Sequence, residues 1–298
     1  MGSKQYRDIA RLEYRLVMKR QPLYSKVIAV ISILVITSCV KDILYNTPHP
    51  FKGALEINVD WSHSSSEADI PKEYVILTDN YKQVVNKNTN IFNQLLSKGE
   101  HTLAIYNEPE HISFKGTSAS ADVDSDECIP ATPGYLFSFT RNIYINADDT
   151  LRVTAPMKQL VRRLDVQLTA TDGDYSRVQK ATATLSGIAS AIDIKTENRS
   201  KPAQAKNIFS RNGKEFSLFF RLLGIIPDQN QTLTVDILFT DGSSLSVKSD
   251  LTEFLKEFNY RTQPLQLKGT LSLPVEASVA GAGIIDWNEI FEGNIDAY

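Results

Sequence analysis

The sequence has little of what metal sites and catalytic sites are built from. Its 298 residues include two cysteines and four histidines, and His49, His63, His101 and His111 share no ligand spacing. Zinc sites usually pair their ligands at short intervals. The sequence has no Gly-x-Ser-x-Gly elbow and no Walker loop, and Gly281-Ala282-Gly283 lacks the spacing of a dinucleotide site. We therefore predict no catalytic residue, no metal, no cofactor and no enzymatic activity.

Two weaker candidates carry little chemistry. Asp122, Asp124 and Asp126 imitate the start of a calcium loop, but Glu127 and Pro133 stand where that loop needs glycine and glutamate. The sequence favours a solvated acidic loop, with a loose calcium site as the minor alternative. Cys128 could act as a nucleophile only beside a positioned base. No such base stands nearby in the sequence, so we interpret Cys128 as a structural or exposed thiol.

Excess positive charge is also absent. The chain has a formal net charge of −3, and residues 1–38 hold seven basic and two acidic side chains, which leaves −8 for the rest. A nucleic-acid partner needs a basic face. The sequence therefore predicts no nucleic-acid binding.

No apolar run reaches the roughly 20 residues of a membrane-spanning helix. The stretch Val27–Cys39, VIAVISILVITSC, is shorter and follows basic residues. A basic region, an apolar region and small residues at a cleavage point make a secretory signal. The run resembles the lipobox of bacterial lipoproteins, with cleavage between Ser38 and Cys39. That resemblance implies diacylglycerol on Cys39, and a buried core helix is the alternative.

We thus expect a signal peptide over residues 1–38 and a lipid-anchored tether over 39–53. Residues 1–17 are polar and mixed in charge, whereas Met18-Lys19-Arg20 opens a better-shaped signal. Translation from Met18 and a cytosolic extension from Met1 remain alternatives. If Cys39 is lipidated, Cys128 has no partner for a disulfide, so we expect a packed core to supply the stability.

The mature chain opens with a strongly patterned strand. Leu55, Ile57, Val59 and Trp61 alternate with polar residues, which places all four side chains on one face. Asn90–Ser97 is expected to be a short helix or an irregular turn, and residues 118–126 a loop. Further strands are predicted at Tyr74–Thr78, Glu100–Asn107, Tyr135–Ile145 and Leu151–Thr154.

A second block with the same pattern follows Pro156. Asp241-Gly242 predicts a hairpin turn, and Leu251–Phe258 predicts one or two helical turns. Strands are predicted at Leu164–Ala170, Ala181–Ile188, Phe216–Leu222, Leu233–Phe239, Leu245–Val247, Leu265–Leu273 and Ile284–Trp287. Many short strands at regular spacing favour an all-β fold built of β-sandwiches. A boundary near Ala155–Gln159 divides the chain into predicted domains over residues 54–155 and 156–298.

Several segments resemble the fimbrillin superfamily, whose members are subunits of type V pili. APMKQLVRRLDVQLTA at Ala155–Ala170 resembles the opening of the second fimbrillin domain, and its basic pair Arg162-Arg163 is the distinctive part. Two other segments also resemble the superfamily: ATATLSGIA at Ala181–Ala189 and GIIDW at Gly283–Trp287. A further similarity is a lipobox followed by an ALEINVDW-type first strand. Within the superfamily, the sequence is most similar to FimB-type anchor and minor-subunit lipoproteins.

The resemblance implies two tandem transthyretin-like β-sandwich domains and partners that are other fimbrial subunits. Stalk fimbrillins are cut by a protease after a basic residue beyond the first strands, whereas anchors stay whole and keep their lipid. Here the loop after Trp61 holds Lys72 as its only Lys or Arg. This favours an uncut anchor at the outer membrane.

Strand complementation gives candidate interface residues. An incoming strand supplies main-chain hydrogen bonds and side chains for open pockets. The candidates for exchange are Leu55, Ile57, Val59, Trp61, Ile284, Ile285 and Trp287. The alternative is that they belong to ordinary core strands, because alternation does not separate the two cases.

Two function classes follow. The first is a lipid-anchored fimbrial subunit that roots or regulates a pilus. The second is a glycan-binding surface lipoprotein. Sugar sites usually need exposed aromatic side chains, and this class is less well supported because both tryptophans, Trp61 and Trp287, lie in strand patterns.

Overall fold

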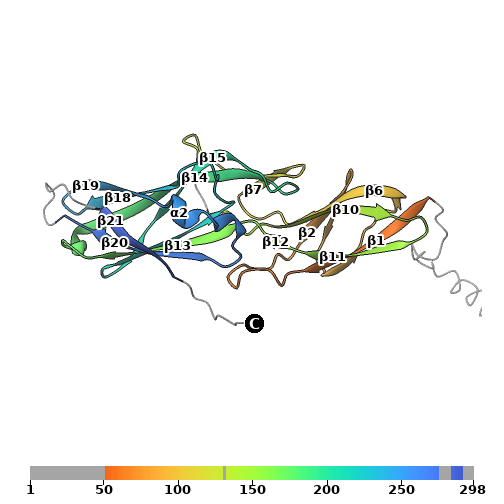
Figure 1. Ribbon diagram of the computed structural model, residues 1–298, viewed down its shortest axis with the longest axis horizontal. Coiled ribbons are helices and arrows are strands. Elements are labelled where there is room, and N and C mark those ends of the chain that lie inside the picture. Colours follow the sequence, from red (N-terminus) through yellow and green to blue (C-terminus); the bar gives the residue numbers. More distant parts are fainter. Residues whose placement is uncertain (1–50, 130–131, 275–282, 291–298) are drawn as a thin grey trace, which may run out of the picture. The chain divides into compact units, whose positions relative to one another are not determined.

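The computed structural model describes residues 51–129, 132–274 and 283–290. The predicted signal peptide, Ser38 and Cys39 lie outside the described residues. In the described part the protein is all-β, with strands β1 to β21 and three short helical segments (Figure 1). The helical segments are η1 (Tyr175–Arg177), α2 (Thr252–Leu255) and η2 (Phe258–Tyr260). No helix among these residues is long and apolar enough to cross a membrane.

Two sheets enclose a first core. One has the order β11-β1-β4, with β5 paired to the start of β1, and the other has the order β12-β10-β6-β2-β3. The first sheet comprises β1 (Lys52–Asp60), β4 (Thr89–Ile91), β5 (Leu96–Ser97) and β11 (Thr150–Pro156). The second comprises β2 (Tyr74–Thr78), β3 (Tyr81–Val85), β6 (Gly99–Tyr106), β10 (Phe137–Ile145) and β12 (Lys158–Gln159). Inward-facing residues of both sheets, among them Leu55, Ile105 and Phe137, form one buried cluster, as in a β-sandwich.

Two further sheets enclose a second core. Their strand orders are β16-β17-β13-β20-β21 and β19-β18-β14-β15-β9. The first comprises β13 (Arg162–Ala170), β16 (Ser210–Asn212), β17 (Glu215–Leu222), β20 (Leu265–Ser272) and β21 (Gly283–Ile290). The second comprises β9 (Cys128–Ile129), β14 (Val178–Asp193), β15 (Arg199–Ile208), β18 (Thr232–Phe239) and β19 (Ser244–Asp250). Leu164, Val235 and Leu267 lie in their shared core.

The two sandwiches repeat one topological feature. The first long strand of each pairs in parallel with a late strand, β1 with β11 and β13 with β20. Parallel partners cannot be joined by a tight hairpin. In both cases the chain crosses to the facing sheet before it returns, which closes the sandwich.

Three strands that precede residue 155 join the second pair of sheets. The hairpin of β7 (Ile112–Lys115) and β8 (Ser118–Ala121) pairs through β8 with the end of β14, and β9 pairs with β15. Some strands before residue 155 therefore belong to the second pair of sheets, so sheet membership does not change at that residue.

Two local predictions were wrong. Residues 90–97 do not form a helix: 90–91 end β4 and 96–97 form β5, both paired with β1, and 92–95 connect them irregularly, as the alternative predicted. Residues 118–121 form β8 rather than a loop, because β7 and β14 pair with them on either side. The β18–β19 hairpin and the helical turns after Leu251 are confirmed.

Candidate strand-exchange interface

β1 carries three of the predicted interface residues, and the structure buries all three. Leu55 and Ile57 have no exposed surface and Val59 is 4% exposed. β1 is an interior strand, paired with β11 on one side and with β4 and β5 on the other. Its side chains share one face, as the alternation predicts, and that face is core.

Trp61 follows β1 directly and continues this apolar face. Its ring meets Phe137 edge-on at 5.5 Å between centroids and Tyr74 at 6.0 Å. Edge-to-face aromatic pairs at such spacing contribute about 0.5–1.5 kcal/mol beyond their buried area. Trp61 therefore closes the end of the first core and is no open platform.

β21 carries the other three predicted residues and lies at a sheet edge. Among the described residues it pairs with β20 alone, and its Ile284 is buried while Ile285 is 54% exposed. Trp287 is partly buried against the second core, and its Nε1 donates a hydrogen bond to Ser249 Oγ of the facing sheet at 2.7 Å. The three residues are brought together on one strand but not on one face.

A bulge explains how Ile284 and Trp287 come to face the same way. Residues three apart on a regular strand point to opposite faces. Here the pairing of β20 and β21 shifts register between Lys268 and Thr270, and Asp286 has a φ of 56°. The space opposite is provided by Gly269, where a Cβ would lie 3.1 Å from Trp287 and 3.2 Å from Ile284.

Arg162 and Arg163, the basic pair noted in the sequence, have different structural roles. Arg162 is 2% exposed, and its guanidinium donates hydrogen bonds to the carbonyls of Leu160 at 2.9 Å and Arg261 at 2.6 Å. Burial lowers the pKa of Arg162 to about 10, and the positive charge of Arg199 acts in the same direction. Arg162 thus remains charged at neutral pH and fixes the backbone before β13 to the turn before β20.

Arg163 points to the other face and holds the loop after β1. Its Nη1 lies 3.1 Å from Glu67 Oε2, its Nη2 pairs with Asp165 at 2.7 Å, and its guanidinium lies 4.4 Å from the ring centre of Phe219. In the same loop, the backbone N–H of Ser65 donates to Gln159 Oε1 at 2.9 Å. The loop that contains Lys72 is therefore attached to the start of the second block at two points.

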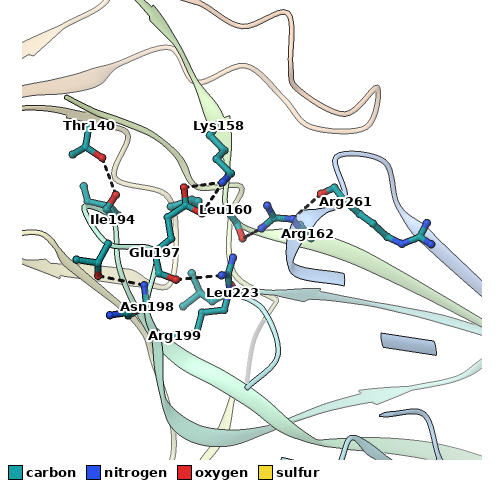
Figure 2. Close-up of polar contacts among 11 residues, drawn as sticks. Thr140, Lys158, Leu160, Arg162, Ile194, Glu197, Asn198, Arg199, Leu223 and Arg261 are labelled. Atoms are coloured by element: carbon teal, nitrogen blue, oxygen red, sulfur yellow. Dashed lines mark hydrogen bonds and ion pairs between the residues drawn. The ribbon is translucent and has the colours of Figure 1, made fainter. Parts of the chain in front are cut away.

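Figure 2 shows a group of polar contacts between the β10–β12 region and the turn between β14 and β15. Lys158 Nζ binds both carboxylate oxygens of Glu197, at 2.6 and 2.7 Å. Thr140 Oγ1 donates to the carbonyl of Ile194 at 2.9 Å. Arg199 Nε donates to the carbonyl of Leu223 at 3.0 Å, and its Nη2 is buried without a partner among the described residues.

The weaker sequence candidates do not assemble into a site. Asp124 Oδ1 accepts backbone hydrogen bonds from Asp126 and Cys128, so it serves as a turn residue. Burial raises the pKa of the Cys128 thiol, with Asp124 adding to the effect, so the thiolate is disfavoured. Within the described ranges, no three His, Cys, Asp or Glu residues are grouped to hold a metal ion. His49 lies outside those ranges.

Sequence reasoning missed the β7–β8 hairpin. Phe114 of β7 stacks on Tyr106 of β6 at 4.3 Å, while Ala119 of β8 pairs with Ile192 of β14. One hairpin thus contacts strands of both sandwiches. The available signal was Gly116, which takes a φ of 62° at the hairpin turn.

A comparison with known protein families identifies the family of this chain. A family model described as fimbrillin-A associated anchor proteins Mfa1 and Mfa2 matches residues 74–286. The chain belongs to this anchor family. A comparison with curated proteins found no match.

Solved structures share the fold of this anchor-family member at low identity. The fimbrial anchor protein Mfa2 from Porphyromonas gingivalis is 10% identical, with a TM-score of 0.56 over 80% of this chain and 97% of that one. A proposed adhesin from Bacteroides ovatus is 14% identical, with a TM-score of 0.57 over 72% and 87%. A proposed polysaccharide-binding protein from Bacteroides thetaiotaomicron is 10% identical, with a TM-score of 0.54 over 80% and 98%.

Proposed function

We propose that this anchor-family member is a lipid-anchored fimbrial subunit that roots or regulates a type V pilus and joins its partners by β-strand complementation. Family membership supports the fimbrial role. The signal-like run ending at Cys39 supports lipid attachment. The observation that carries strand complementation is β21, an edge strand whose backbone pairs on one side only among the described residues.

β21 is a better candidate for exchange than β1. Each fully buried Leu, Ile or Val side chain contributes about 1.5–3 kcal/mol relative to exposure. Release of β1 would expose Leu55, Ile57 and Val59, whereas Ile284 is the one buried hydrophobic residue of β21 and is 8% exposed. Release of β21 therefore costs less of the core, and its outer edge could also accept a strand directly.

Lipid attachment is tested in the bacterium that makes the protein. Cys39→Ala should move the protein from the membrane fraction to the soluble fraction and release fibres into the medium. Cys128→Ala is the matched control and should change neither. If Cys39→Ala protein stays in the membrane with full-length attached fibres, the lipid-anchor proposal is wrong.

Strand exchange is tested by a disulfide that fixes β21 to β20. Thr270 and Ile285 are register partners, so Thr270→Cys with Ile285→Cys in a Cys128→Ala background should crosslink the pair. We expect subunit joining to be blocked until a reductant is added. The control Asp236→Cys with Ser246→Cys crosslinks the β18–β19 hairpin and should leave joining intact. Joining that is unaffected by the β20–β21 crosslink would rule out exchange of β21 and leave edge addition.

The glycan-binding surface lipoprotein is the second candidate function. The Bacteroides thetaiotaomicron structure described as a proposed polysaccharide-binding protein supports a role of this kind. Trp61 and Trp287 both pack against core residues, so a site would have to bind by hydrogen bonds rather than by aromatic stacking.

A further inference from the structure

A polar hollow of about 480 Å³ opens on the outer face of the sheet that contains β14 and β18. Small hydroxyl side chains form much of its lining, with longer polar side chains beside them. Its lining includes Thr184, Gln204, Thr232, Thr234, Asp236 and Lys248.

A bulge in β14 creates part of this hollow. The pairing of β14 with β15 shifts between Leu185 and Ile188, so that Ser186 and Gly187 stand opposite Gln204. Bulges disrupt the ladder locally and redirect side chains. Ser186 Oγ, which also lines the hollow, accepts a hydrogen bond at 3.3 Å from the backbone N–H of Thr232 on β18, on the other side of β14.

The polar groups around the hollow are free to bind a ligand. The side chains of Thr184, Gln204, Thr234, Asp236 and Lys248 form no hydrogen bond or ion pair with other described residues. Asp236 and Lys248 line the same hollow with opposite charges and yet do not pair. Convergent polar groups of this kind give a binding site its orientation and specificity.

The lining excludes two classes of ligand. No hydrophobic residue contributes to it, so a lipid or an apolar peptide would gain little from burial there. The floor belongs to interior strands, since β14 lies between β18 and β15, and β18 lies between β19 and β14. Neighbouring strands occupy both edges of β14 and of β18, so a peptide cannot add there as a strand.

We propose that the hollow binds a neutral oligosaccharide. Sugar hydroxyls both donate and accept hydrogen bonds, which matches threonine hydroxyls, an amide, a carboxylate and an ammonium group. One anionic and one cationic side chain balance each other, which favours a neutral sugar over an acidic one. The proposal rests on the second candidate function and is independent of the anchor role.

The test is native affinity electrophoresis of the full chain, purified from membranes in detergent, through gels that contain dextran, mannan or hyaluronan. We expect retardation by a neutral glycan and not by anionic hyaluronan. Thr234→Arg and, separately, Thr184→Arg fill the hollow on an exposed sheet face. Each should raise the glycan concentration needed for half-maximal retardation at least tenfold. Ser217→Arg, on the outer face of β17, is the matched control and should leave retardation unchanged.

Absence of retardation by both neutral glycans would overturn the proposal. So would retardation that survives in both hollow variants, or that Ser217→Arg abolishes, or that only hyaluronan produces. Circular dichroism of each variant separates a filled hollow from a misfolded chain. Because fibre anchoring is measured by the Cys39→Ala experiment, failure of glycan binding leaves that result unaffected.

Discussion

The buried His101 and the exposed Asp79 form an ion pair in the first sandwich, with His101 Nδ1 2.5 Å from Asp79 Oδ2. On the other side of the ring, His101 Nε2 lies 2.7 Å from the carbonyl oxygen of Ser97. Both partners are acceptors, so the doubly protonated ring satisfies both. Burial alone would lower the pKa of His101, but the bonds to Ser97 and Asp79 outweigh it and raise the pKa. The charged histidine thus ties the β2–β3 turn to β5.

This pair predicts a pH-dependent stability. The folded-state pKa of His101 lies above its unfolded value of about 6.5, so the contribution is fully present below that pH and is lost as pH rises through the folded pKa. Asp79→Asn keeps an acceptor and suits the positive φ of 50° at this position. We expect it to lower the free energy of unfolding by about 1 kcal/mol at pH 6, with a smaller difference at pH 9.

Urea denaturation at a series of pH values measures this effect. His63→Gln is the control, because His63 is exposed and should leave the pH profile of stability unchanged. An Asp79→Asn effect of equal size at pH 6 and pH 9 would show that the ion pair does not cause the pH dependence.

The close packing around Gly269, opposite Trp287, predicts that one added methyl group at this position lowers stability. A Cβ at residue 269 would lie within 3.1–3.2 Å of Trp287, Ile284 and Leu168. Overpacking of a formed core costs about 1–3 kcal/mol, so Gly269→Ala should lower stability by that amount and shift Trp287 fluorescence. Gly283→Ala is the matched control, since a Cβ there meets nothing within 4 Å. Equal melting temperatures of the two variants would contradict the predicted crowding.

The alternation of apolar residues predicted the inward faces correctly because period 2 is a local property of a strand. Leu55, Ile57 and Val59 share one buried face as expected. The orientation of Trp287 depends on a bulge opposite Gly269, and no periodicity predicts where such a bulge falls.

Pairing partners are a long-range property and were harder to predict. Residues 118–121 look like a small, polar loop, yet Ser120 pairs with Ala191, which is remote in the sequence. The role of Arg162 also depended on remote groups, because one of its acceptors is the carbonyl of Arg261. The sequence marked the arginine pair as distinctive, and only the fold supplied the partners.

We expect truncation of the Arg162 side chain to cause a large loss of stability. Arg162→Ala would leave the carbonyls of Leu160 and Arg261 without this donor in a buried setting. An unsatisfied buried polar group costs about 1–3 kcal/mol, so we expect a loss of about 2–6 kcal/mol for the two acceptors together. Arg152→Ala is the control, because the Arg152 side chain is 73% exposed and its ion pair with Glu56 contributes about 0–1 kcal/mol. Similar urea midpoints for both variants would show that the buried bonds add little.

The β7–β8 hairpin predicts coupling between the two sandwiches during unfolding. Phe114 stacks on Tyr106 of β6 at 4.3 Å, and β8 is paired with β14, so the hairpin contacts strands of both sandwiches. A double-mutant cycle with Phe114→Ala and Tyr106→Ala should give a coupling energy of about 0.5–1.5 kcal/mol. If the hairpin also couples the sandwiches, Phe114→Ala should divide a single thermal transition into two. Ser113→Ala, a change of an exposed neighbour on the same strand, should preserve one transition. A coupling energy of zero together with one transition in every variant would show that the hairpin does not couple the two sandwiches energetically.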